Sequence, residues 1–125
     1  MKKLLATVIL GTLASLAIAD APAPAAKWRV TVDGQPTNDG QVQFRMTPHE
    51  GEAVMVTVEV KHGRPVTYLT RDISDAFKAA LPRKRFKSEV IAEKVLLKAG
   101  PGEADFALEL VGSTLAGSRI FVTAN

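Results

Sequence analysis

Apolar and polar residues alternate along much of the chain, and this alternation predicts β-strands. Trp28, Val30 and Val32 are separated by charged or polar residues, which is the period-two pattern of a strand with one buried face. The same pattern recurs over residues 41–46 and 54–61. These three segments are therefore expected to be strands that each turn one face to a hydrophobic core.

Residues typical of turns separate the predicted strands. Glycine, proline, asparagine and aspartate are concentrated in residues 33–40, a proline and a glycine lie within residues 47–51, and His62 and Gly63 follow the third strand. Residues 66–70 are predicted to form a fourth strand. The first half of the chain is therefore expected to fold as an antiparallel meander.

One helix is predicted in the middle of the chain. Its apolar stripe has helical spacing and consists of Ile73, Ala76, Phe77, Ala80 and Leu81. Asp72 or Ser74 is placed to cap the start of this helix, and Pro82 prevents its continuation. We expect a short helix that lies on the core.

The pattern after this helix is again typical of strands. Val90, Ile91 and Val95 favour a strand within residues 86–98, although the Glu and Lys residues of this segment are also compatible with a helix. We predict a strand here and a final strand over residues 118–123.

One passage resembles a known group of folds. Residues 95–103 contain a strand followed by an Ala-Gly turn, and apolar residues then alternate at Phe106, Leu108 and Leu110. This passage resembles one common in secreted immunoglobulin-like β-sandwiches. The resemblance implies a mainly β fold, an antiparallel sandwich with one short helix, and α+β is the alternative. The absence of cysteine excludes the Cys, Trp, Cys spacing of antibody-type domains, and no function follows from the resemblance.

The N-terminal pattern predicts export. Lys2 and Lys3 precede an apolar, uncharged run that ends in Ala-Ile-Ala before Asp20, which is typical of a secretory signal peptide. As a helix this run spans roughly 24 Å against a bilayer core of about 30 Å, so cleavage is favoured over membrane anchoring. The expected organisation is a signal peptide over residues 1–19, an Ala/Pro tether over residues 20–26 and a single β-rich domain over residues 27–125.

Composition narrows the location and the chemistry. Without cysteine, the exported chain has no disulfide, no thiolate metal ligand and no cysteine to carry a lipid. No second apolar run of similar length follows the signal peptide, so no transmembrane segment is expected after cleavage. We expect a periplasmic or secreted protein.

The excess of positive charge is concentrated in one region of the chain. Lys2 and Lys3 leave with the signal peptide, so the net charge falls from +3 to +1 and gives no reason to expect specific nucleic-acid binding. Basic residues nevertheless far outnumber acidic ones over residues 64–87. The predicted partner-binding residues are Arg64, Arg71, Arg83, Lys84, Arg85 and Lys87. Together with an open sheet edge, they are expected to engage a protein partner or an anionic component of the cell envelope.

The residues suited to catalysis or metal binding are few. The chain has only two histidines and no local signature of a nucleophilic, phosphate-binding or zinc site, so we expect no enzyme and no cofactor. The alternative function is periplasmic copper binding at His49, with Met55 or Glu50, because methionine and histidine are copper ligands in exported proteins. Met46 is expected to point into the core, and His62 is expected to lie too far away to take part. A hydrolase is a more distant alternative.

Overall fold

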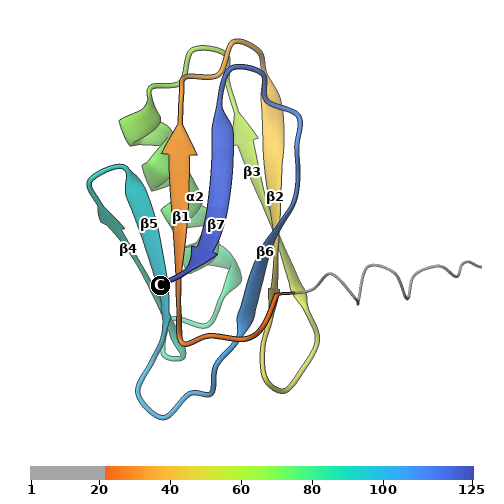
Figure 1. Cartoon of the computed structure of the whole chain (residues 1–125), viewed down its shortest axis with the longest axis vertical. Helices are drawn as coiled ribbons and strands as arrows, with labels where there is room; N and C mark the ends of the chain where they lie inside the picture. The colour runs from red at the N-terminus through yellow and green to blue at the C-terminus, as the bar shows by residue number, and fades with distance from the viewer. Residues whose placement is uncertain (1–21) are drawn as a thin grey trace, which may run out of the picture.

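The computed structural model describes residues 22–125 (Figure 1). Its elements are, in chain order, β1 (Lys27–Asp33), β2 (Gly40–Thr47), β3 (Val54–Val60), α2 (Val66–Ala80), β4 (Phe86–Ile91), β5 (Lys94–Ala99), β6 (Ala107–Ser113) and β7 (Arg119–Ala124). The signal peptide predicted for residues 1–19 lies outside the described residues. No helix within residues 22–125 has the length and apolar character needed to cross a membrane.

The strands form two antiparallel sheets. One sheet has four strands in the order β4-β5-β1-β7, and the other has three in the order β3-β2-β6. Every strand pair is antiparallel. The prediction of a mainly β, sandwich-like fold is therefore confirmed, and residues 22–125 contain one helix.

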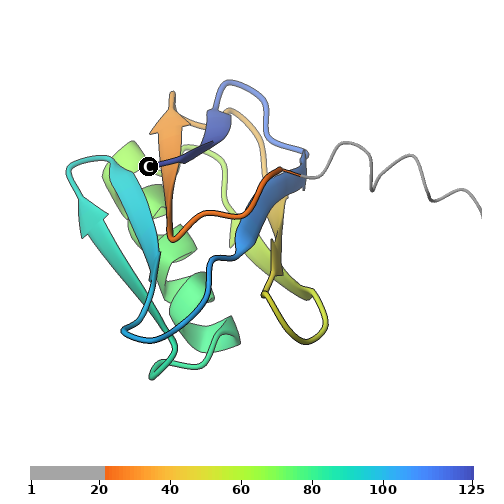
Figure 2. The same cartoon turned by 60° about the horizontal axis from the view of Figure 1, so that its bottom comes forward.

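Helix α2 fills the side on which the two sheets diverge. It contacts β3 of the smaller sheet and both β4 and β5 of the larger one, whereas β6 and β7 contact each other on the opposite side (Figure 2). Leu69, Ile73 and Phe77 form its fully buried face. The ring of Phe77 lies 5.2 Å from that of Phe44 on β2, so the helix extends the hydrophobic core between the sheets.

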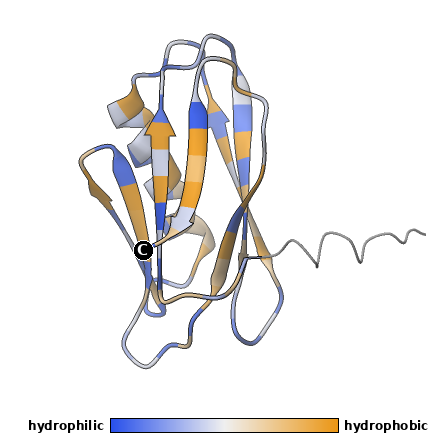
Figure 3. Cartoon of the chain, in the orientation of Figure 1, coloured by the Kyte–Doolittle hydropathy of each residue, from blue (hydrophilic) through white to orange (hydrophobic). Residues whose placement is uncertain are grey.

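The alternation of apolar residues correctly predicts which side chains enter the core. Figure 3 shows the resulting alternation of hydrophobic and hydrophilic bands along the strands. The buried residues of the first three strands are Trp28, Val30, Val32, Val42, Phe44, Met46, Val56, Val58 and Val60. The turn predicted for residues 47–51 is also confirmed, because it joins β2 and β3 as a hairpin.

The fourth predicted strand is wrong. Residues 66–70 form the first turns of α2, which begins at Val66 directly after Pro65. Val66 and Thr70 are β-branched and favoured a strand, but the spacing of Leu69, Ile73 and Phe77 places the segment on the helix's buried stripe. Pro65 is compatible with this position because the first backbone N–H groups of a helix have no partner within the helix.

The predicted meander is also wrong, because β1 and β2 belong to different sheets. The segment between them crosses from one sheet to the other and turns at Gly34, whose φ is +94°. A Cβ atom at Gly34 would collide with the carbonyl oxygen of Gly117 in the loop before β7, so glycine is required here. Alternation identifies the buried face of a strand but not its neighbours, which explains the error.

The segment over residues 86–98 is β structure, as predicted, but it contains two strands. Its hairpin turn consists of Ala92 and Glu93, and Ile91 is the cross-strand partner of Lys94. Ala92 has a φ of +57°, a left-handed conformation that glycine or asparagine adopts more readily. The turn was missed because neither residue is typical of a tight hairpin.

The last residues of the predicted tether pair with the domain. Ala25 exchanges two backbone hydrogen bonds with Phe106, and the carbonyl of Ala26 accepts one from Ala99. The indole N–H of Trp28 also donates to the Phe106 carbonyl, at 2.8 Å. These bonds hold the chain at the start of β1 against the end of β5 and the segment that leads into β6.

Candidate functional site: a basic hollow beside an open strand edge

Helix α2 divides the six predicted partner-binding residues into two groups. Arg64 and Arg71 lie near its start, and the other four, Arg83 to Lys87, follow its end. Because the helix has 15 residues and rises about 1.5 Å per residue, its two ends are roughly 22 Å apart. Arg64, before the start of the helix, is therefore well separated from the four basic residues after its end, whereas Arg71 lies part of the way along the helix.

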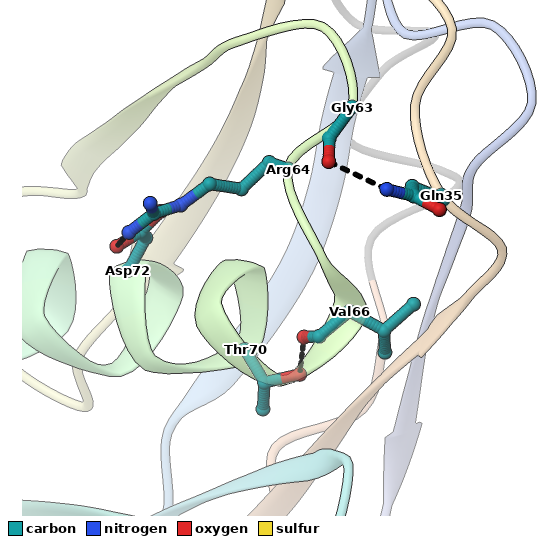
Figure 4. Close-up of polar contacts among 6 residues, drawn as sticks. All are labelled: Gln35, Gly63, Arg64, Val66, Thr70 and Asp72. Carbon is teal, nitrogen blue, oxygen red and sulfur yellow. Dashed lines mark hydrogen bonds and ion pairs between the residues drawn. The ribbon is translucent and has the colours of Figure 1, made fainter.

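The group at the start of α2 has a structural role. The guanidinium of Arg64 donates two hydrogen bonds to the carboxylate of Asp72, at 2.8 and 3.0 Å (Figure 4). This pairing raises the pKa of Arg64 above its ordinary value. Arg64 and Arg71 also lie over the ring of Tyr68, with their guanidinium carbons 5.1 and 5.7 Å from its centre. Arg64 therefore holds the preceding loop against the helix, and its charge is balanced by Asp72.

Arg85, at the end of α2, is also engaged within the fold. Its Nε lies 3.0 Å from a carboxylate oxygen of Glu103, and its guanidinium covers the ring of Phe86 at 5.5 Å. The Arg85 carbonyl accepts a hydrogen bond from Gly100 at 2.8 Å. Arg85 thus joins the start of β4 to the loop after β5. Because its guanidinium is already paired with Glu103, it is less suited to bind a partner.

Three other cations surround an open hollow of about 280 Å³ at the end of α2. We call this feature the basic hollow, and its lining residues are Lys78, Arg83, Phe86, Lys87 and Ser88. Its lining contains no carboxylate. None of its three cations forms an ion pair with another residue in the range 22–125.

Different elements hold the three cations around the basic hollow. Lys78 projects from the last turn of α2, where the partial negative charge of the helix end favours a cation. Arg83 follows the helix, and Lys87 lies on β4 with an exposed side chain on the face opposite to Phe86 and Ser88. Lys78 is not among the predicted site residues. Its position four residues before Pro82 nevertheless places it in the last turn of the helix, close to the basic residues that follow. Lys84 is exposed but does not line the hollow.

The floor of the basic hollow is packed against neighbouring elements. Phe86 is buried and packs edge-on against Phe106, with their ring centres 5.3 Å apart. The hydroxyl of Ser88 lies 2.7 Å from that of Ser74 on α2, in a buried contact. The basic residues thus lie beside a packed and largely buried floor, and this arrangement suits an anionic group attached to a larger molecule.

An open backbone edge runs beside the basic hollow. Within the described part of the chain, β4 is an edge strand that pairs only with β5. One row of its backbone N–H and C=O groups thus has no strand partner. Such an edge accepts an additional strand from another molecule. Lys87 belongs both to this strand and to the hollow, so the two features are continuous.

The predicted copper residues His49, Glu50 and Met55 lie on or beside the β2–β3 hairpin. His49 is exposed in the β2–β3 turn, Met46 is buried in the core as predicted, and Met55 is 46% exposed on the outer face of β3. His62 is at the far end of β3, where its backbone N–H donates to Asp39. Among residues 22–125 no group of three His, Asp or Glu side chains is arranged to hold a metal ion.

Two carboxylates of the last third form ion pairs within the fold. Glu103 pairs with Arg85, and Glu109 pairs with Arg45 on the neighbouring strand at 2.8 Å.

Comparison with protein-family models and with curated proteins finds no match to this chain.

Proposed function

We propose that this protein is an exported, non-enzymatic binding protein of the cell envelope that engages an acidic segment of a protein partner. The basic hollow receives carboxylates of the partner, and the open edge of β4 pairs with its backbone. The observation that carries the proposal is that three basic residues, Lys78, Arg83 and Lys87, line one hollow beside the open edge of β4, with no carboxylate among its described lining residues.

Physical chemistry favours this combination of contacts. Lys78 and Arg83 line one hollow, where a bound carboxylate can accept charge-assisted hydrogen bonds from them. Backbone pairing along β4 adds affinity that does not depend on the partner's sequence, whereas the hollow selects for acidic residues. The location, periplasmic or secreted, follows from the predicted signal peptide and is part of the proposal.

The experiment is capture of partners from the producing cell's own envelope fraction on the tagged mature protein. The variant Lys78→Gln/Arg83→Gln removes two cations of the basic hollow without touching the core. We expect it to lose captured protein and to show a flatter dependence of the remaining capture on salt. Lys61→Gln is the matched control, because Lys61 is an exposed cation at the end of β3, away from the hollow.

Hydrogen exchange tests the strand edge separately. A captured partner that pairs with β4 should slow exchange of those β4 amides that do not bond to β5, while exchange on β3 stays unchanged.

Equal capture by the wild type and the Lys78→Gln/Arg83→Gln variant at every salt concentration would contradict the proposal.

A further inference from the structure

A row of lysines crosses the outer face of the four-stranded sheet. Lys98 on β5 is the direct cross-strand partner of both Lys27 on β1 and Lys87 on β4. Adjacent strands are about 4.8 Å apart, so three cationic side chains leave this face within roughly 10 Å. Like charges directly opposite one another destabilise a sheet, so the row has no advantage for folding itself.

Among residues 22–125, Glu89 is the one carboxylate that forms an ion pair with this row. Glu89 lies 2.9 Å from Lys98, and the hydrogen bond and charge of Lys98 lower the pKa of Glu89. Lys27 and Lys87 form no ion pair within residues 22–125. The row therefore keeps excess positive charge.

The positive charge also extends along the strands. Arg29 follows Lys27 on the same face of β1, and its neighbours across the strands are the uncharged Leu96 and Thr123. Its Nε is buried without a hydrogen-bond partner in the described residues. Arg29 and Lys94 line a shallow hollow of about 250 Å³ on this face. The cations thus form a two-dimensional array rather than a single line.

Exposed apolar side chains lie on the same face at two opposite strands. Ile91 at the end of β4 is 55% exposed, and Phe121 on β7 is 45% exposed. They belong to one row across the sheet, in which Lys94 and Thr31 lie between them. Figure 3 shows the hydrophobic end of β4 next to the hydrophilic start of β5.

We propose that this outer face docks on the surface of an anionic phospholipid bilayer. A flat array of cations matches a two-dimensional array of headgroup phosphates, whereas a linear polyanion matches only one row at a time. Ile91 and Phe121 add apolar contacts at the boundary between headgroups and acyl chains. This surface goes beyond the proposed partner site, with which it shares only Lys87.

The test is co-sedimentation of the mature protein with vesicles of phosphatidylcholine, with or without phosphatidylglycerol. We expect binding only to the anionic vesicles, and weaker binding as salt rises. Each cation near such a surface contributes about fivefold in affinity, so Lys27→Gln/Lys98→Gln should weaken binding by roughly 25-fold. Lys61→Gln removes one cation on the other side of the molecule and should change binding less than twofold. Circular dichroism of each variant verifies folding.

Two further variants separate the apolar contribution and the neighbouring site. Ile91→Ser should weaken vesicle binding without changing its salt dependence, because it removes only apolar contact. Lys78→Gln/Arg83→Gln should keep vesicle binding even where it abolishes partner capture, so failure of either proposal is seen independently. Three results would overturn the lipid proposal: no binding to anionic vesicles, equal binding to both vesicle types, or a concentration-dependent dimer that the Lys27→Gln/Lys98→Gln variant abolishes.

Discussion

The hydroxyls of Ser74 and Ser88 lie 2.7 Å apart in the buried contact between α2 and β4. They connect the two elements that carry Lys78 and Lys87, and Ser88 itself lines the basic hollow. Each hydroxyl has the other as its partner and both side chains are buried, so that an unpaired polar group there would be unfavourable.

The serine pair predicts a non-additive effect on stability. Ser74→Ala or Ser88→Ala alone leaves one buried hydroxyl unpaired and should reduce the free energy of unfolding by about 1–3 kcal/mol. The double variant should cost clearly less than the sum, because it removes both polar groups. Urea unfolding followed by the fluorescence of Trp28, the only tryptophan, measures all four proteins. Strictly additive losses would show that the two hydroxyls do not interact.

The hairpin between β4 and β5 predicts opposite effects of one substitution at two positions. Ala92→Gly relieves a left-handed backbone at φ +57° and should stabilise the protein by about 0.5–1 kcal/mol. Ala79→Gly is the matched control in the exposed part of α2, and this substitution should destabilise the protein by a similar amount. Thermal unfolding of the two variants gives the signs directly. Destabilisation by Ala92→Gly would contradict the turn geometry.

The contacts of Ala25 predict where the domain begins. Deletion of residues 20–24 from the mature protein removes none of the backbone bonds to Phe106 and Ala99. Deletion of residues 20–26 removes all three, at about 0.5–1.5 kcal/mol each, and should lower the free energy of unfolding by roughly 2 kcal/mol. Urea unfolding of the two truncated proteins provides the comparison. Equal stability of both would show that the bridge at Ala25 contributes nothing.

Local patterns predict burial well in this chain. The alternation over residues 28–32 and 42–46 identifies core side chains because the strand repeat is two residues, whatever lies beside the strand. The helix was placed too late because Val66 and Thr70 favour a strand locally, and only packing against both sheets decides otherwise. Secondary structure is thus predictable here where local preference and tertiary packing agree.

The surface sites were harder to predict because they join residues distant in sequence. Lys27 and Lys98 are neighbours only because β1 pairs with β5, and no local pattern indicates that pairing. Conversely, the sequence predicts that Arg64 and Arg85 bind a partner, but in the structure they form ion pairs with Asp72 and Glu103 of the same chain. Clustering of basic residues in sequence is therefore a weaker guide to a binding surface than strand register.

The pair Glu89 and Lys98 predicts linked changes in stability and membrane binding. Because Lys98 lowers the pKa of Glu89 in the folded protein, the stabilisation is present above the unfolded pKa of about 4.3 and is lost as pH falls through the folded value. Glu89→Gln should therefore reduce stability near pH 7 slightly, and the difference from wild type should vanish at low pH and shrink in high salt.

The same substitution should strengthen vesicle binding. Glu89→Gln removes the carboxylate that balances the lysine row, so affinity for vesicles containing phosphatidylglycerol should rise about fivefold although the protein is less stable. Glu59→Gln is the matched control, since Glu59 is an exposed carboxylate on β3 of the other sheet, and it should change neither the acid dependence nor the affinity. Unfolding as a function of pH and co-sedimentation measure the two effects. Equal vesicle affinity of Glu89→Gln and wild type would show that the charge of this face does not govern binding, whatever its effect on stability.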